Sequence, residues 1–191
     1  AFVIKDILKE LGVQSGLIGT VKNMVGDKDF HTELTTPDPY DMHKLFEMMV
    51  NEGIKYCVME TSSQAFHQMR LAGISFKTGV FTNLTQDHLD YHGTMEDYFL
   101  AKKKLFDVSD LAVINIDDEY GRRVADMYKG SGRNVITFSI KDDSAYCTAK
   151  NIQLTGTGSK FLMVSEGSIN RVEFSMPGEY SVQNAIGSAL A

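Results

Sequence analysis

The alternation of apolar runs with helical patterns over residues 13–139 is the feature that most limits what this chain can fold into. Five short apolar runs predict strands, and they read SGLIGTV, KYCVME, FKTGVFT, LAVINI and NVITFS. Helical patterns separate most of these runs, for example over residues 38–52, where Leu45, Phe46, Met49 and Val50 are expected to face inward. Another covers residues 94–106, where Asp97 lies three residues after Thr94 in a capping-box-like start. Strands that alternate with helices are typical of a parallel sheet covered on both faces. The sequence therefore predicts an α/β fold with a three-layer, mostly parallel sheet.

The pattern changes after residue 139. Three runs that alternate apolar and polar residues follow one another with no helix between them, and they read CTAKNIQL, SKFLMVSE and RVEFSM. Gly, Ser and Asn residues join them, as in turns between neighbouring strands. We expect a small antiparallel sheet toward the C-terminus, followed by a last helix in NAIGSALA.

Charge and hydropathy narrow the possible functions. The net charge of -6 argues against a surface for nucleic acid or an anionic membrane, because either would need a basic face. No apolar run approaches the ~18 residues that a membrane span needs, and no signal peptide is visible. Cys57 and Cys147 lie in strand-like runs without metal-binding spacing, so we expect buried, reduced thiols in a cytosolic protein, with a disulfide as the alternative.

Both ends of the sequence lie within helical patterns. AFVIKDILKELG begins inside an amphipathic helix without an N-cap, and the final NAIGSALA is again helical. We therefore expect residues 1–191 to be one piece of a longer protein, truncated at both ends.

The stretch from Thr82 to Phe106 has the highest density of chemically active side chains. It follows the strand-like GVF and contains DHLDYH, a glycine and a helix with three consecutive lysines. In open α/β sheets, ligands bind at the C-terminal ends of the strands. We therefore interpret this loop as the metal and phosphate side of an active site.

Glu60 and His88 are the candidate metal ligands. Glu60 ends one predicted strand and His88 follows the next, so both fall at the same edge of a parallel sheet. One carboxylate and one imidazole with water suit Mg²⁺ or Mn²⁺ better than structural zinc. The alternative is that Glu60 caps the amides of the following helix, and spacing alone does not decide between the two.

Three lysines, Lys102 to Lys104, occupy successive helical positions and point about 100° apart, so they cannot all serve one site. Most lysines in such a run are solvated. Ala101 leaves room for Lys102 to lean inward, although the spacing does not single it out.

Several polar residues in loops are candidates for holding an anionic ligand. Hydroxyl donors and an arginine fork suit a diphosphate or a carboxylate, whereas the alternative for each hydroxyl is helix capping. Asn184 could bond the edge of a ligand base or cap the last helix. In addition to Asn184, the candidates are Thr35, Thr36, Ser62, Gln68 and Arg70.

These motifs together resemble those of the Mur ligases of bacterial peptidoglycan synthesis. The segments that carry the resemblance are NLTQDHLDYHGTMEDYFLAKKKLF, VMETSSQAF, TTPDP, INIDDEYGRR and MPGEYSVQNAIGSALA, in family order and over nearly the whole chain. The resemblance identifies residues 1–191 as the central, ATP-binding domain. It implies a uridine-nucleotide-binding domain before it, a further domain after it, and a phosphate-binding loop just before Ala1. Without that loop we expect this piece alone to be inactive.

The resemblance also implies roles for individual residues. Glu60 and His88 correspond to Mg²⁺ ligands, and Lys102 corresponds to a lysine that CO₂ carbamylates, which makes it a third metal-binding and catalytic group. Asn184 corresponds to an asparagine near the adenine of ATP. Leu34 departs from an asparagine often found before the two threonines. The positions that correspond to contacts with the UDP-N-acetylmuramoyl-dipeptide are Thr35, Thr36, Ser62, Gln68 and Arg70.

The implied activity is ATP-dependent amide formation through an acyl phosphate in the bacterial cytoplasm, by a monomer that binds neither nucleic acid nor membrane. Within the family, DHLDYHG and METSS favour the ligase that adds the third amino acid of the precursor peptide. The choice between meso-diaminopimelate and L-lysine stays open. The alternatives are another ligase of the superfamily, of the folylpolyglutamate or cyanophycin synthetase type or a Mur-like amidotransferase partner, and a non-catalytic binding domain.

Overall fold

The computed structural model describes residues 1–191, which form two compact units. The first unit contains Ala1–Ile74 and His88–Leu105, and the second contains Ser75–Asp87 and Phe106–Ala191. The chain therefore passes from the first unit to the second and back before it completes the second. No helix is long and apolar enough to cross a membrane.

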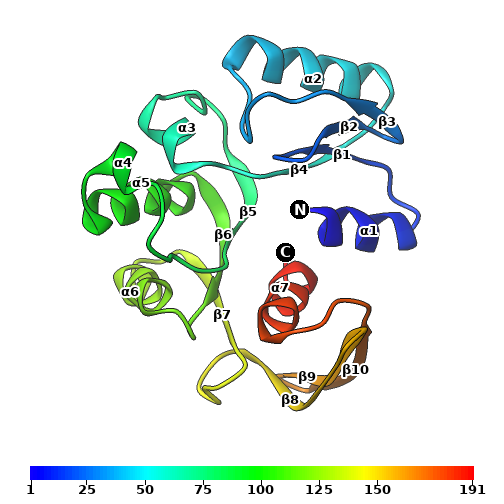
Figure 1. Cartoon of the computed structure of the whole chain (residues 1–191), viewed down its shortest axis with the longest axis vertical. Helices are drawn as coiled ribbons and strands as arrows, with labels where there is room; N and C mark the ends of the chain where they lie inside the picture. The colour runs from blue at the N-terminus through cyan, green and yellow to red at the C-terminus, as the bar shows by residue number, and fades with distance from the viewer. The chain divides into compact units, whose positions relative to one another are not determined.

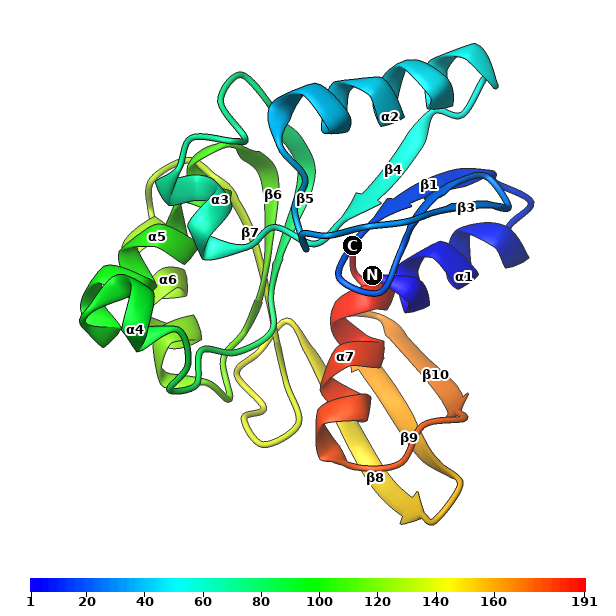
Figure 2. The ribbon, with the colours of Figure 1, turned by 45° about the horizontal axis from the view of Figure 1, so that its top comes forward.

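The first unit is built on a four-stranded sheet in the order β3-β2-β1-β4. Its strands are β1 (Ser15–Ile18), β2 (Asn23–Val25), β3 (Lys28–Phe30) and β4 (Tyr56–Met59). β1 and β4 are parallel, whereas β2 and β3 form an antiparallel hairpin. Helices α1 (Phe2–Glu10) and α2 (Pro39–Asn51) lie on opposite faces of this sheet (Figures 1 and 2).

Burial explains why β1 is the centre of that sheet. All four of its residues are buried, as expected for a strand covered on both faces. A Cβ at Gly16 would lie 2.3 Å from Met49 Cε, so the glycine leaves room for the Met49 side chain of α2 in its present position. On the other face, the buried Lys5 of α1 donates to the carbonyl oxygens of Ser15 and Gly26, each at 2.9 Å. These contacts hold both helices against the strand that leads into the candidate site.

Three further helices follow: α3 (Ser63–His67), α4 (Leu89–His92) and α5 (Met95–Asp107). Thr94 and Asp97 form the predicted capping box at the start of α5, where Asp97 N donates to Thr94 Oγ1 at 3.1 Å. The Thr94 hydroxyl in turn donates to Asp97 Oδ2 at 2.6 Å. The cap fixes where α5 begins and hence which of its residues follow the DHLDYH segment.

The second unit contains a six-stranded sheet in the order β10-β9-β8-β7-β6-β5. β5 to β8 are parallel, and β8 to β10 are antiparallel. Helices α6 (Glu119–Tyr128) and α7 (Glu179–Ala189) lie on opposite faces of the sheet (Figures 1 and 2). The strands are β5 (Phe76–Phe81), β6 (Ser109–Asn115), β7 (Asn134–Ser139), β8 (Cys147–Thr155), β9 (Gly158–Ser165) and β10 (Ser168–Phe174).

This architecture confirms the predicted α/β fold, with two refinements of the strand arrangement. The strands of the predicted parallel sheet are divided between two hydrogen-bonded sheets. The three C-terminal strands are antiparallel, as predicted, but they extend the six-stranded sheet. They do so because Cys147 and Thr148 at the start of β8 pair with Phe138 and Ser139 at the end of β7.

Two predictions of burial were wrong. Val50 was expected to face inward from its helix, yet it is 73% exposed, and Met42 is buried instead, on the same face as Leu45 and Met49. Cys57 is exposed on β4, whereas Cys147 is buried as predicted, and both cysteines are free. In both cases an apolar run was assumed to be buried throughout, although only one face of the element packs inward.

Asp117 carries the main polar junction of the second unit. Its Oδ2 accepts from Ile140 N at 2.8 Å and from Gln183 Nε2 at 2.9 Å, and its Oδ1 accepts from the buried Ser139 hydroxyl. One carboxylate thus joins the end of β7 to α7.

We predict that Asp117→Ala lowers the free energy of unfolding by about 2–3 kcal/mol, because it leaves buried donors without an acceptor. Chemical denaturation of the chain would measure this. Asp110→Ala is the matched control, since it removes only the exposed ion pair with Lys77, and it should leave the midpoint nearly unchanged. Equal midpoints for the two variants would contradict the structural role of Asp117.

Candidate active site

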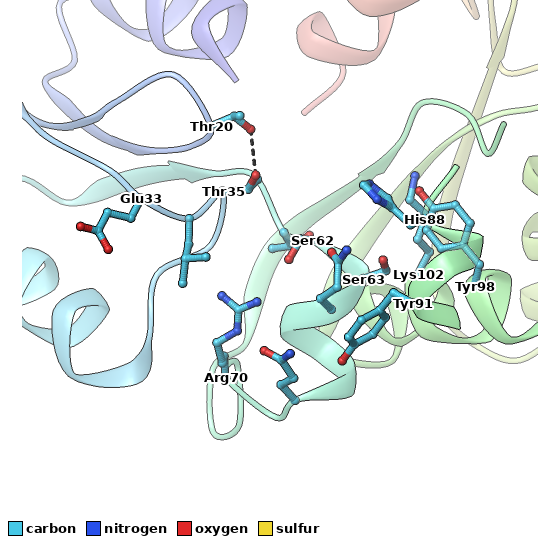
Figure 3. A pocket seen from close by; sticks show the side chains of 14 residues that line it. Thr20, Glu33, Thr35, Ser62, Ser63, Arg70, His88, Tyr91, Tyr98 and Lys102 are labelled. Atoms are coloured by element: carbon cyan, nitrogen blue, oxygen red, sulfur yellow. Dashed lines mark hydrogen bonds between the residues drawn. The ribbon is translucent and has the colours of Figure 1, made fainter. Parts of the chain in front are cut away.

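A pocket of about 660 Å³ in the first unit is open to solvent. It lies where the loops after β1 and β4 meet α3, α4 and α5 (Figure 3). The residues that line it are Thr20, Glu33, Leu34, Thr35, Thr61, Ser62, Ser63, Gln64, Gln68, Arg70, His88, Tyr91, Tyr98 and Lys102. Six of the residues predicted from the sequence are therefore in one pocket: Thr35, Ser62, Gln68, Arg70, His88 and Lys102.

Glu60 lies directly behind this lining. β4 pairs with β1 so that Ile18 is opposite Met59, and Glu60 N continues the ladder by donating to Ile18 O at 2.8 Å. The carboxylate then packs over Gly19, where a Cβ would lie only 2.9–3.2 Å from the carboxylate atoms. The Glu60 side chain is 35% exposed, although Glu60 ends the apolar run KYCVME.

Thr20 connects Glu60 to the pocket, and the sequence analysis did not identify it. Glu60 Oε2 accepts from both Thr20 N at 2.9 Å and Thr20 Oγ1 at 2.8 Å. The Thr20 hydroxyl also lies 3.0 Å from the Thr35 hydroxyl, as the dashed line in Figure 3 shows. The sequence signal for Thr20 was only its place after a strand, because its partners lie 15 and 40 residues away.

Thr36 has a different place from its neighbour Thr35. It is completely buried and does not line the pocket. Its hydroxyl donates to Glu60 O and accepts from Ser62 N, each at 2.9 Å. The Thr36 side chain therefore fixes the loop after β4 to the loop before α2, and its hydroxyl has no free proton for a ligand.

Ser62 both caps a helix and faces the pocket. Its Oγ accepts from Ala65 N at 3.1 Å, so the capping role considered as an alternative is present. A serine hydroxyl that accepts one bond still has its own proton to donate. Ser62 can therefore serve as a cap and as a donor to a ligand at the same time.

Arg70 is the cation on the α3 side of the pocket. Its Nη1 donates to Thr36 O, while its Nε is buried and has no hydrogen-bond partner. The preceding Met69 has a positive φ of 58°, which is uncommon for a residue with a side chain. The chain thus turns sharply after Gln68, and the guanidinium keeps donor capacity at the pocket.

His88 and Lys102 lie on the other side of the pocket around the ring of Tyr98 (Figure 3). His88 has a left-handed backbone (φ 54°), and its ring stands edge-on to Tyr98 at 5.9 Å. Lys102 follows Tyr98 by one helical turn, and its Nζ lies 5.3 Å from the centre of the same ring. The structure thus singles out Lys102 from its two neighbours as the lysine of the pocket.

Two further histidines support this side. The ring of His92 stacks on Tyr98 at 5.0 Å and shares a 2.8 Å hydrogen bond between its Nε2 and Ser63 Oγ. Burial, together with the nearby rings of His67 and His88, lowers the pKa of His92. His67 shares a 2.8 Å hydrogen bond with Tyr91. These contacts hold α3 against the DHLDYH segment.

Asn184 is separate from these residues. It is exposed on α7 in the second unit, next to the Gln183 that bonds Asp117. It is absent from the residues that line the pocket of the first unit.

The donors at the pocket limit which metal could bind there. No three His, Cys, Asp or Glu residues are grouped so as to hold an ion by themselves. Glu60 offers Oε1, which accepts no hydrogen bond, and His88 offers an imidazole at the rim. This small set fits a cation such as Mg²⁺, which keeps several waters and substrate oxygens as ligands, and does not fit a closed protein cage.

Comparison with known proteins agrees with this geometry. The model of the Mur ligase middle domain matches residues 2–191. The chain is 45% identical over 190 residues to the UDP-N-acetylmuramoyl-L-alanyl-D-glutamate--2,6-diaminopimelate ligase of Clostridium tetani, covering 100% of this chain and 38% of that protein. It is 37% identical over 199 residues to the ligase of the same name from Geobacillus kaustophilus, covering 99% and 40%.

Solved structures give the same result for the fold. A structure of a UDP-N-acetylmuramoyl-L-alanyl-D-glutamate--2,6-diaminopimelate ligase matches with a TM-score of 0.86 and 26% identity, over 99% of this chain and 39% of that one. A D-alanyl-D-alanyl-adding ligase from Acinetobacter baumannii matches with a TM-score of 0.72 at 15% identity, over 98% and 38%, which supports the fold alone. The chain spans about two fifths of the length of these relatives. It belongs to the Mur ligase middle domain family.

Proposed function

We propose that the protein containing this chain is an ATP-dependent ligase that adds 2,6-diaminopimelate to UDP-N-acetylmuramoyl-L-Ala-D-Glu in peptidoglycan synthesis. The observation that carries the proposal is the single pocket that brings Thr35, Ser62 and Arg70 to one side and His88 and Lys102 to the other. Relatives that carry this activity in their names are 37–45% identical along essentially the whole chain. Those names also favour diaminopimelate over L-lysine.

The proposed reaction has two steps. A carboxylate oxygen of the dipeptide attacks the γ-phosphorus of ATP, the bond to the ADP oxygen breaks, and an acyl phosphate forms. The amine of the amino acid then attacks the acyl carbon, phosphate leaves, the amine loses a proton, and the amide bond remains. Such a reaction depends mainly on positioning and on neutralising charge. Arg70 supplies positive charge on one side of the pocket (Figure 3).

Glu60 and His88 are the proposed ligands of Mg²⁺. Thr20 and Gly19 hold the Glu60 carboxylate in place, and the contact with Tyr98 holds the His88 ring. When bound there, a divalent cation supplies positive charge beside the phosphates. Lys102 is the proposed site of carbamylation, in which the ammonium group loses two protons as Nζ bonds to the carbon of CO₂, which leaves a carbamate anion. A carbamate can then bind or orient the metal, which an ammonium group cannot do.

The remaining proposed contacts concern the nucleotide and the dipeptide. A phosphate-binding loop joined to the start of α1 would lie beside Glu60, since Ala1 N is 4.0 Å from Glu60 Oε1. Asn184 of α7 is the proposed contact for the adenine, and Gln68 is a proposed contact of the dipeptide. Thr36 is proposed to act only indirectly, because it holds the loop after β4 against the loop before α2. We further propose a cytoplasmic monomer.

The activity can be tested with the full-length protein. We predict that ATP and UDP-N-acetylmuramoyl-L-Ala-D-Glu yield ADP and the tripeptide product only when diaminopimelate is supplied, with L-lysine as the matched control. Mass spectrometry identifies the product. Turnover of a folate-type acceptor with no turnover of the muramoyl dipeptide would contradict the proposal and favour another ligase of the superfamily.

A second prediction concerns the metal ligands. Glu60→Ala and His88→Ala should each lower kcat by about a hundred-fold or more, because the charge that opposes the phosphates is lost. Steady-state kinetics over a range of Mg²⁺ concentrations would measure this.

The controls are Glu47→Ala and His43→Ala, which alter exposed residues of α2 outside the pocket. Near-normal kcat and unchanged Mg²⁺ dependence in either pocket variant would refute the assignment of that residue.

A further inference from the structure

The hydroxyl protons of Thr20 and Thr35 determine which group donates in each hydrogen bond that joins Glu60, Thr20 and Thr35. An ionised carboxylate only accepts hydrogen bonds, and each threonine hydroxyl has one proton to donate. Thr20 Oγ1 lies 2.8 Å from Glu60 Oε2, so the Thr20 proton is donated to Glu60. The 3.0 Å bond between the two hydroxyls then requires Thr35 to be the donor and Thr20 the acceptor.

The geometry around Glu60 keeps this direction fixed. Thr20 N donates to the same Oε2 at 2.9 Å, so backbone and side chain approach one carboxylate oxygen together. Gly19 lies against the carboxylate so closely that even a Cβ would clash. Neither partner of the Thr20 bond is therefore free to turn away without breaking two hydrogen bonds.

Thr35 consequently faces the pocket as an acceptor. Its only proton is used on Thr20, whereas its oxygen lone pairs remain for a ligand. The exposed carboxylate of Glu33 lies in the same part of the lining and also only accepts. The donors lie elsewhere, because the proton of Ser62 and the guanidinium of Arg70 are still available.

We infer that the Thr35 hydroxyl accepts a peptide amide N–H of the substrate, while the anionic groups of the same molecule bind at Ser62 and Arg70. This assignment rests on the proposed function, since a muramoyl dipeptide carries both amides and carboxylates. It reverses the expectation from the sequence, in which Thr35 was a hydroxyl donor to an anion. The hydrogen-bonding direction at Thr35 thus selects a peptide over a simple polyanion.

The test is a binding cycle with the full-length protein. Isothermal titration compares UDP-N-acetylmuramoyl-L-Ala-D-Glu with two analogues, in each of which one peptide N–H is replaced by an ester oxygen. Wild-type protein should bind one of the two esters about ten-fold more weakly than the amide. Thr35→Val should bind that ester and the amide with equal affinity, and Thr35→Ser should retain the wild-type preference.

Each outcome decides between distinct claims. A wild-type protein that does not bind the parent dipeptide refutes the proposed function. If wild-type protein binds the parent dipeptide and both esters with equal affinity, the Thr35 assignment alone is refuted. This comparison uses only wild-type protein and does not depend on the folding of a variant. A ten-fold preference that persists in Thr35→Val shows that another group accepts the amide and also overturns the assignment.

Discussion

The contact of the Glu60 carboxylate with Gly19 and Thr20 is the interaction on which the candidate site depends. β1 and β4 are parallel and in register up to Ile18 and Met59, so the two chains leave the sheet side by side. The missing side chain at Gly19 lets the carboxylate approach, and the two bonds from Thr20 fix it. The register between β1 and β4 thereby places the Glu60 carboxylate next to Thr20, which lines the pocket.

The opposite side of the pocket is organised around an aromatic ring. Tyr98 contacts His88 at its edge, His92 on its face and the ammonium group of Lys102, and all three contacts are local in sequence. The helical spacing of Tyr98 and Lys102 places both on one face of α5, whereas Lys103 and Lys104 point in other directions. Burial, the largest cause, lowers the pKa of the stacked His92.

Much of the fold could be predicted from residue patterns, because each strand and helix has a local pattern of apolar residues along the chain. The alternation of strands and helices predicted the α/β fold. The prediction that Glu60 and His88 follow neighbouring strands of one sheet was wrong, because β4 and β5 lie in different sheets. The capping box at Thr94 was also local and correctly predicted. Thr20 was missed and the hydroxyl of Thr36 was misplaced, because their roles depend on partners 15 to 40 residues away. Val50 was placed inward because periodicity gives the apolar stripe of α2 but not its edges. The proposed role of Lys102 came from the resemblance to a family, because the spacing did not single out this lysine.

The proposed Mg²⁺ site requires His88 and Glu60 to share one divalent cation. The most direct measurement is pulsed electron paramagnetic resonance of Mn²⁺ bound to the full-length protein in the presence of a nucleotide, with ¹⁵N-labelled histidine. We predict nitrogen coupling from a directly bound imidazole that disappears in His88→Ala, together with weaker Mn²⁺ binding in Glu60→Ala. Bound Mn²⁺ without histidine coupling in the wild-type protein, or coupling that survives in His88→Ala, would contradict it.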